Sequence, residues 1–241
     1  MDPAYLAPTA IIDSDSEPIR AFVQEVAGGG ADPVDRAVRL YSAVRDRIRY
    51  DPYSPFYRPE HYRASRVLES GRGYCVPKVS VLCAAGRAAG IPTRAGFATV
   101  RNHLATRQLL DYLGSDLFVY HGYVELYLEG RWVKATPAFN RELCARHGVD
   151  PLEFDGRQDS IFQPYDKANR RFMEYVAFHG TFADIPLDRI LAAWEETYGR
   201  ERVRGWIETY ERYGTLRRDF GKEDVVQAAP EAASAGGEKT P

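Results

Sequence analysis

The stretch HGYVELYLEGRWVKATP, residues 121–137, decides the fold. Two runs in which apolar and polar residues alternate flank the pair Glu129 and Gly130, a pattern typical of a β-hairpin with a two-residue turn. The turn places Leu128 opposite Arg131. We therefore predict antiparallel pairing over residues 118–139.

The hairpin register also predicts the position of a histidine. Counting back from the turn places Tyr123 opposite Thr136 and His121 opposite Ala138. Successive side chains of a strand point to opposite faces. The face predicted to be buried carries three aliphatic residues, Val124, Leu126 and Leu128. His121 is therefore expected on the more polar face, where a substrate groove would lie.

A helix is predicted upstream, in CVPKVSVLCAAGRAAG, residues 75–90. Its content of Ala, Val and Leu favours a buried helix, and Gly90 is a typical stop signal. Pro77 suits the first helical turn, where a missing N–H has no consequence. Cys75 therefore stands at the N-terminus of this helix, directly after the glycine-containing stretch 71–74.

The other segments complete an α+β pattern. We predict an amphipathic helix in residues 32–50, an aromatic-rich loop in 51–62, strands in 91–100 and 171–178, and one or two helices in 184–213. The division into domains is predicted as an N-terminal extension (1–30), one domain (31–220) and a disordered tail (221–241).

Composition and charge narrow the class of protein. With 44% hydrophobic and 27% charged residues, the 241-residue chain has the composition of an ordinary globular protein. The 32 Lys and Arg against 34 Asp and Glu argue against nucleic acid as a partner. No apolar run approaches the roughly 20 residues of a membrane span, and the N-terminus lacks the pattern of a secretion signal. Three cysteines suit a reducing compartment, so a cytoplasmic location is expected.

Cys75 is the candidate nucleophile. At the N-terminus of a helix, unpaired N–H groups and the helix dipole favour a thiolate, so the pKa is expected to fall below the usual value of roughly 8.5. The same N–H groups can bind an oxyanion during acyl transfer. The alternative role for Cys75 is that of a small buried apolar residue. His121 is the candidate base. The alternative role for His121 is that of a structural histidine whose ring is hydrogen-bonded to a neighbouring tyrosine or carbonyl group.

Three motifs resemble the transglutaminase-like superfamily: GRGYC (71–75), RAAGIPTR (87–94) and the hairpin from His121 to Pro137. The resemblance covers about residues 41–139 and implies a papain-like core, with a helix packed on an antiparallel sheet. It implies that Cys75 is the nucleophile and His121 its base. The family has an aspartate before the proline as third member, and Thr136 occupies that position in this sequence.

The departure at Thr136 leaves the orienting residue open. A carboxylate stabilises an imidazolium by charge, whereas a threonine hydroxyl only fixes the tautomer by a hydrogen bond. Thr136 is the first candidate because it aligns with the aspartate. Asn140 is a second, since papain-like enzymes use an asparagine, and Asp155 or Asp159 of the following loop are further candidates.

The predicted function is cysteine acyl-transfer chemistry on a peptide, amide or thioester carbonyl. Whether the acyl group passes to water or to an amine is left open. The competing prediction is a binding module that lost activity through the change at Thr136. Cys144 and His147 lack further ligands at a zinc spacing, so neither a metal nor a cofactor is predicted.

Overall fold

The computed structural model describes residues 1–29, 32–103, 105–162, 172–216 and 218–223. The helices are α1 (Glu17–Ala27), α2 (Pro33–Arg47), α3 (Ala64–Ser70), α4 (Cys75–Ala88), α5 (Arg107–Leu113), α6 (Arg141–His147), α7 (Leu187–Tyr198) and α8 (Arg200–Tyr213), with short 3₁₀ turns η1 (Pro3–Tyr5), η2 (Pro59–His61) and η3 (Phe220–Lys222). The strands are β1 (Arg49–Tyr50), β2 (Arg72–Gly73), β3 (Thr93–Asn102), β4 (Leu117–Leu128), β5 (Arg131–Ala135) and β6 (Met173–Phe182).

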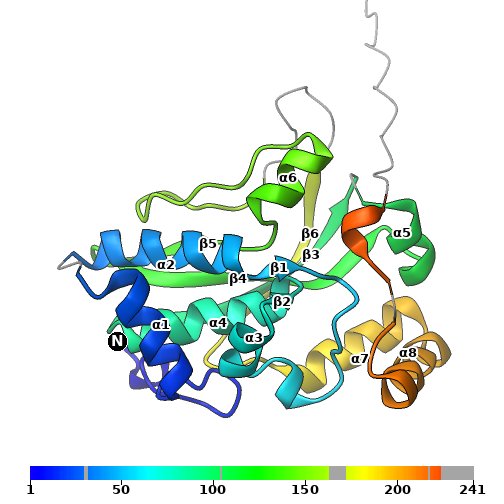
Figure 1. Ribbon diagram of the computed structural model, residues 1–241, viewed down its shortest axis with the longest axis horizontal. Coiled ribbons are helices and arrows are strands. Elements are labelled where there is room, and N and C mark those ends of the chain that lie inside the picture. Colours follow the sequence, from blue (N-terminus) through cyan, green and yellow to red (C-terminus); the bar gives the residue numbers. More distant parts are fainter. Residues whose placement is uncertain (30–31, 104, 163–171, 217, 224–241) are drawn as a thin grey trace, which may run out of the picture.

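An antiparallel sheet in the order β5-β4-β3-β6 forms the centre of the fold. Helix α4 packs against β4 and β3, while α6 lies on the other side of the sheet (Figure 1). A second sheet pairs β1 with β2 in parallel, immediately before α4. The prediction of an α+β fold with a helix on an antiparallel sheet is confirmed.

The β4–β5 hairpin has the predicted turn and register. Leu128 pairs with Arg131, and positive φ angles of 48° at Glu129 and 83° at Gly130 match a turn of the primed type. The ladder ends at the pair Val124 and Ala135, however. The predicted pairs of Tyr123 with Thr136 and His121 with Ala138 are therefore wrong as ladder pairs, because the chain leaves β4 after Ala135 and the Thr136 N–H bonds to the Ser160 carbonyl at 3.0 Å.

The predicted exposure of the His121 face is also wrong. His121, Tyr123 and Glu125 are all buried, at 5%, 3% and 6% exposure. Phe162 packs on the His121 ring at 5.7 Å, and Phe178 of β6 packs on Tyr123 at 6.4 Å. Sequence alternation cannot show this, because the covering groups come from segments far along the chain.

Helix α4 is buried along almost its whole length. It ends at Ala88, and Gly90 follows with a φ of +75°, as the glycine signal predicts. Helix α1, within the predicted N-terminal extension, packs on α2, α3 and α4. The predicted boundaries at 30–31 and 220–221 stay predictions, and residues 224–241 of the predicted tail lie outside the described part of the chain.

The C-terminal helices cover the aromatic loop. Gly199, with a φ of +93°, separates α7 from α8, so the predicted helical region 184–213 is two helices. Phe56 of the loop contacts the rings of Trp194, Trp206 and Tyr210 at 4.8, 6.0 and 5.9 Å. The loop therefore packs on α7 and α8 as well as on its own rings.

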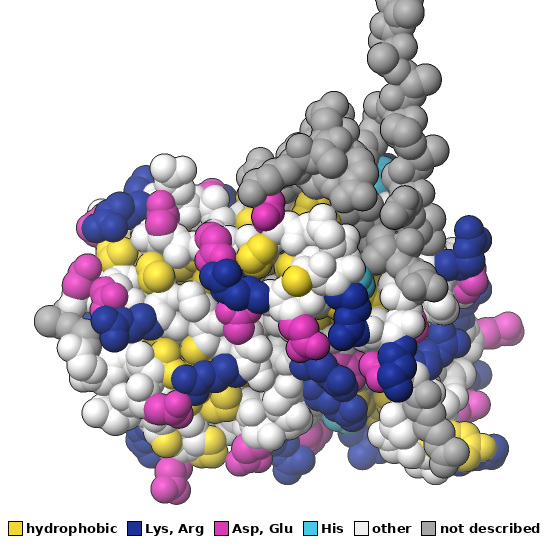
Figure 2. All heavy atoms as spheres, turned by 45° about the horizontal axis from the view of Figure 1, so that its top comes forward, with side chains coloured by type: hydrophobic (Ala, Val, Ile, Leu, Met, Phe, Trp, Pro, Cys, Tyr) yellow, Lys and Arg dark blue, Asp and Glu magenta, His cyan; other side chains and the backbone are white. Residues whose placement is uncertain are grey.

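Two further features of the structure are the distribution of surface charge and the hydropathy of the helices. On the face drawn in Figure 2, basic and acidic side chains are interspersed. Within the described ranges, no helix combines the length and apolarity needed to cross a bilayer.

Candidate active site

Cys75 is the first residue of α4, as predicted, and local sequence explains its place. Gly71, with a φ of +63°, ends α3 in the left-handed conformation. Gly73 then lies so close to the helix that a Cβ there would sit 2.9 Å from the Pro77 Cβ. The two glycines thus allow the chain to turn directly into α4.

The sulfur of Cys75 faces backbone N–H groups, but it does not become a thiolate at neutral pH. The N–H groups of Gly122 and Val76 lower its pKa, yet burial has the larger effect and raises the pKa to about 11. Cys75 is only 9% exposed. The expectation of a lowered pKa is therefore wrong, because desolvation of the charged form outweighs the N–H groups at the helix N-terminus.

His121 follows a β-bulge in β4. It pairs with Ala98, whereas the next pair is Phe118 with Val100, so β4 has one extra residue at this point. Tyr120 absorbs the irregularity with a φ of 55°. A bulge changes the direction of neighbouring side chains and is common beside active sites.

The imidazole of His121 is buried and neutral. Burial lowers its pKa to about 4. Its Nε2 has no hydrogen-bond partner among the described residues. A base with a free ring nitrogen and a thiol with a high pKa form a neutral pair at pH 7.

Cys75 and His121 line the same cavity, which has a volume of about 50 Å³. The two residues on which the prediction of function depends are therefore brought together by α4 and β4. A larger cavity of about 200 Å³ lies beside it, between β1, α6 and the segment 218–222. Tyr50 lines both cavities, but neither Cys75 nor His121 lines the larger one, so the smaller one is the candidate active site.

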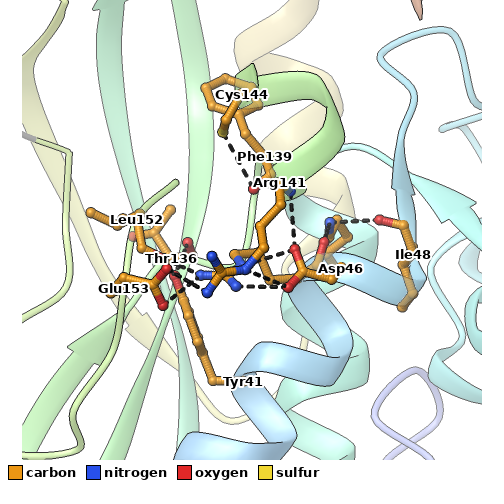
Figure 3. Close-up of polar contacts among 11 residues, drawn as sticks. Tyr41, Asp46, Ile48, Thr136, Phe139, Arg141, Cys144, Leu152 and Glu153 are labelled. Carbon is orange, nitrogen blue, oxygen red and sulfur yellow. Dashed lines mark hydrogen bonds and ion pairs between the residues drawn. The ribbon is translucent and has the colours of Figure 1, made fainter. Parts of the chain in front are cut away.

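Thr136 lies directly after β5 and is 1% exposed. Its carbonyl accepts a hydrogen bond from the Tyr41 hydroxyl at 3.1 Å (Figure 3). Its own hydroxyl has no hydrogen-bond partner within the described part of the chain. The Thr136 hydroxyl lies near the Tyr175 hydroxyl and lowers the pKa of Tyr175, although burial has the larger effect and raises that pKa to about 12. The two hydroxyls do not have the geometry of a hydrogen bond.

The other candidate orienting residues have partners elsewhere. Asn140 caps α6, and its Oδ1 accepts the Tyr50 N–H at 3.1 Å. Asp155 accepts two backbone N–H groups of its own turn, and Asp159 accepts the Lys134 N–H at 2.9 Å and pairs with its ammonium at 3.1 Å. Neither these three residues nor Thr136 is among the described residues that line the cavity of Cys75 and His121.

An ion-pair network around the buried Arg45 guanidinium, with half-buried and exposed partners, holds the segment that carries Thr136. Arg45 of α2 is fully buried and donates to Asp46 at 2.7 Å, to Glu153 at 3.0 Å and to the Leu152 carbonyl at 2.8 Å. Figure 3 shows Asp46 and Glu153 bridged by Arg141 as well. The network joins α2 to the chain between β5 and residue 153, and so limits movement of Thr136.

Two residues of the site were not found from the sequence. Gly122 supplies an N–H to the sulfur. A glycine inside a strand often marks the close approach of another backbone or a ligand, so Gly122 could have been recognised from its place beside His121. Lys78 is fully buried one turn after Cys75, and its ammonium donates to the carbonyls of Arg45 and Ile48 at 2.8 and 2.7 Å. Nothing in the sequence pattern indicates that this lysine faces inward.

Cys144 and His147 both lie on α6. The Cys144 sulfur is 3.9 Å from the Phe139 carbonyl, as Figure 3 shows, and burial raises the pKa of the thiol to about 11. Within residues 1–29, 32–103, 105–162, 172–216 and 218–223, no group of three or more His, Cys, Asp or Glu side chains is placed to hold a metal ion.

Comparisons with known proteins agree with the motifs. Residues 20–137 match the family model of the transglutaminase-like superfamily. No curated protein matches the sequence. Among solved structures, a "Putative Cysteine Protease from Cytophaga hutchinsonii" is 17% identical with a TM-score of 0.43, over 55% of this chain and 40% of that chain. A "putative protease from Parabacteroides distasonis" is 15% identical with a TM-score of 0.36, over 53% of this chain and 26% of that chain.

The chain therefore spans less than half the length of each of these two structures. The family match coincides with the elements that carry Cys75 and His121, from α1 to the end of the β4–β5 hairpin. By this match, residues 20–137 form a core of the transglutaminase-like superfamily.

Proposed function

We propose that this chain is a cysteine enzyme that acts on an amide or thioester carbonyl through an acyl-enzyme. Cys75 is the nucleophile, and His121 is the base that accepts the thiol proton. The acyl group then passes to water or to an amine. Peptides are the first class of substrate to consider, because residues 20–137 match the transglutaminase-like superfamily.

One observation supports this proposal above the others: the thiol and the imidazole line one cavity. Because both groups are neutral, the proton moves to His121 during attack on the carbonyl, as general-base catalysis requires, instead of before substrate binds. The N–H groups near the sulfur, at Gly122 and Val76, are suited to donate hydrogen bonds to the oxyanion that forms.

The alternative function is a binding module with this fold and no catalysis. Two observations favour it: Thr136 brings no negative charge to the site, and the Nε2 of His121 has no hydrogen-bond partner in the described ranges. An imidazolium formed here would lack the stabilisation that a carboxylate provides. The enzyme proposal therefore requires that attack succeeds with Thr136 in the orienting position.

Incubation with activated thioesters separates the two functions. The enzyme is expected to gain the mass of one acyl group on Cys75, visible by intact-protein mass spectrometry. Cys75→Ala and His121→Ala are expected to lose this adduct, while Cys83→Ala, at a residue with 0% exposure, retains it. Absence of an adduct in the wild-type protein would favour the binding module.

Alkylation gives an independent measurement. Iodoacetamide at neutral pH is expected to modify Cys75 before Cys83 and Cys144, which are 0% and 2% exposed. The rate at Cys75 should fall in His121→Ala, since the imidazole no longer accepts the proton. Equal rates at all three thiols would contradict a special role for Cys75.

A further inference from the structure

The cavity beside Cys75 and His121 has apolar walls. Four of its aromatic rings come from Tyr50, Tyr74, Trp194 and Tyr198. Leu109 and Leu113 of α5 add aliphatic side chains. Among its described lining residues there is no Asp, Glu, Lys or Arg.

The polar atoms of three of these aromatic residues, Tyr74, Trp194 and Tyr198, are already bonded to other groups. The Trp194 Nε1–H donates to the Val119 carbonyl at 3.3 Å. The Tyr198 hydroxyl donates to the Leu117 carbonyl at 3.0 Å and accepts the Val119 N–H at 3.1 Å.

The Tyr74 hydroxyl is likewise engaged, since it donates to the Tyr62 hydroxyl at 2.6 Å. Tyr74, Trp194 and Tyr198 therefore offer ring carbons to a bound group. A polar group that enters this space loses its hydrogen bonds to water and finds few replacements.

The cavity is also small. Its 50 Å³ corresponds to roughly three to five non-hydrogen atoms, given that one water molecule needs about 10–15 Å³. The neighbouring cavity of 200 Å³ differs in character, because Arg146, Arg218 and Lys222 are among its lining residues. The two spaces are thus suited to different parts of a substrate, and the apolar one adjoins the reacting groups.

We propose that this cavity selects acyl donors whose acyl chain ends in a small apolar group of about four carbons, such as an isobutyl group. This inference rests on the proposed function and adds the class of substrate to it. Chains that end in an amide or a carboxylate are excluded by the walls, and a phenyl group exceeds the volume.

The reaction that tests this is thioester exchange. The Cys75 sulfur forms a bond to the acyl carbon, and the bond from that carbon to the donor sulfur breaks. The thiol proton passes through His121 to the leaving thiolate, so charge and atoms balance. The leaving thiol is kept constant through the series, so that a difference in rate reports the acyl chain.

The key comparison uses 4-methylpentanoyl and succinamoyl thioesters, which have nearly the same shape but end in an isopropyl and a carboxamide group. We expect the 4-methylpentanoyl donor to acylate Cys75 at least about tenfold faster, and the succinyl and 3-phenylpropanoyl donors to be slow. Acylation of Cys75 at equal rates by all four donors would overturn the inference and leave the proposed function intact. No adduct with any donor would overturn the proposed function, and the inference with it.

A pair of variants on α5 locates the effect. Leu113→Ala enlarges the cavity and is expected to raise the rate with 3-phenylpropanoyl relative to 4-methylpentanoyl severalfold. Leu110→Ala changes the same helix outside the cavity and should leave that ratio unchanged. If circular dichroism shows that Leu113→Ala does not fold, Leu113→Val is the smaller change that tests the same ratio. An unchanged ratio in the folded Leu113 variant would show that the acyl chain lies elsewhere.

Discussion

Replacement of Thr136 by aspartate tests whether this position orients His121. Thr136 is the first residue after Ala135, whose ladder partner Val124 lies three residues after His121 in β4. If the carboxylate of an aspartate at position 136 lies about 5 Å from the imidazole, the opposite charge contributes about 3 kcal/mol at an effective dielectric constant of about 20. That energy corresponds to about two pKa units. Thr136→Asp should therefore raise the pKa of His121, which is about 4 in this protein, toward the value of an exposed histidine.

The pKa of His121 can be measured from the pH dependence of its imidazole proton shifts by NMR. Thr136→Asn is the matched control, because it has the shape of aspartate without the charge and should leave the pKa nearly unchanged. The rate of Cys75 acylation near pH 7 is expected to rise in Thr136→Asp and not in Thr136→Asn. A His121 pKa that stays the same in both variants would refute the view that residue 136 adjoins the imidazole.

Three further predictions concern stability. The pKa of His121 is about 4 in the folded protein and about 6.5 in the unfolded chain. Between these two pH values only the unfolded state binds the proton, so the free energy of unfolding should fall as the pH drops from 6.5 to 4. Chemical denaturation should show that the wild-type protein loses about 3 kcal/mol more over this window than His121→Asn, in which the other histidines with lowered pKa values remain. Burial lowers the pKa of Lys78 from 10.5 to about 7, so the free energy of unfolding should rise as the pH increases from 7 to 10.5. If the free energy of unfolding of Lys78→Met rises equally with pH, this prediction is contradicted. Gly122→Ala places a Cβ 3.0 Å from Val79 Cγ2 and should lower both the melting temperature and the acylation rate. Gly205→Ala is the control, because Gly205 has open space around it and the change should stabilise α8 by about 0.5–1 kcal/mol. Equal effects of the two substitutions would show that Gly122 is not tightly packed.

The core of the fold could be predicted from local patterns. The turn at Glu129 and Gly130 fixed the register of β4 and β5, and Gly90 fixed the end of α4, because each signal depends only on the backbone of a few residues. The places of Cys75 at the start of α4 and of His121 in β4 could be predicted for the same reason. Each lies in an element whose position is set by neighbouring residues.

Properties that depend on distant segments could not be predicted. The burial of His121 comes from Phe162, which lies 41 positions later in the chain, and a strand pattern carries no information about such a cover. The thiol pKa had the wrong predicted direction because the position of Cys75 at a helix N-terminus is local, whereas its desolvation depends on the whole fold. The bulge at Tyr120 gave no signal either, since a positive φ is uncommon for a tyrosine.

The neutral form of Cys75 affects how readily its sulfur is oxidised by peroxide. Hydrogen peroxide oxidises the thiolate, and a thiol with a pKa of about 11 is ionised in only about one molecule in ten thousand at pH 7. The buried sulfur is thus shielded from conversion to sulfenic acid, in contrast to cysteines that sense peroxide through a permanently ionised sulfur. If Cys75 is the nucleophile, as proposed, the protein would keep it in the reduced form between encounters with substrate.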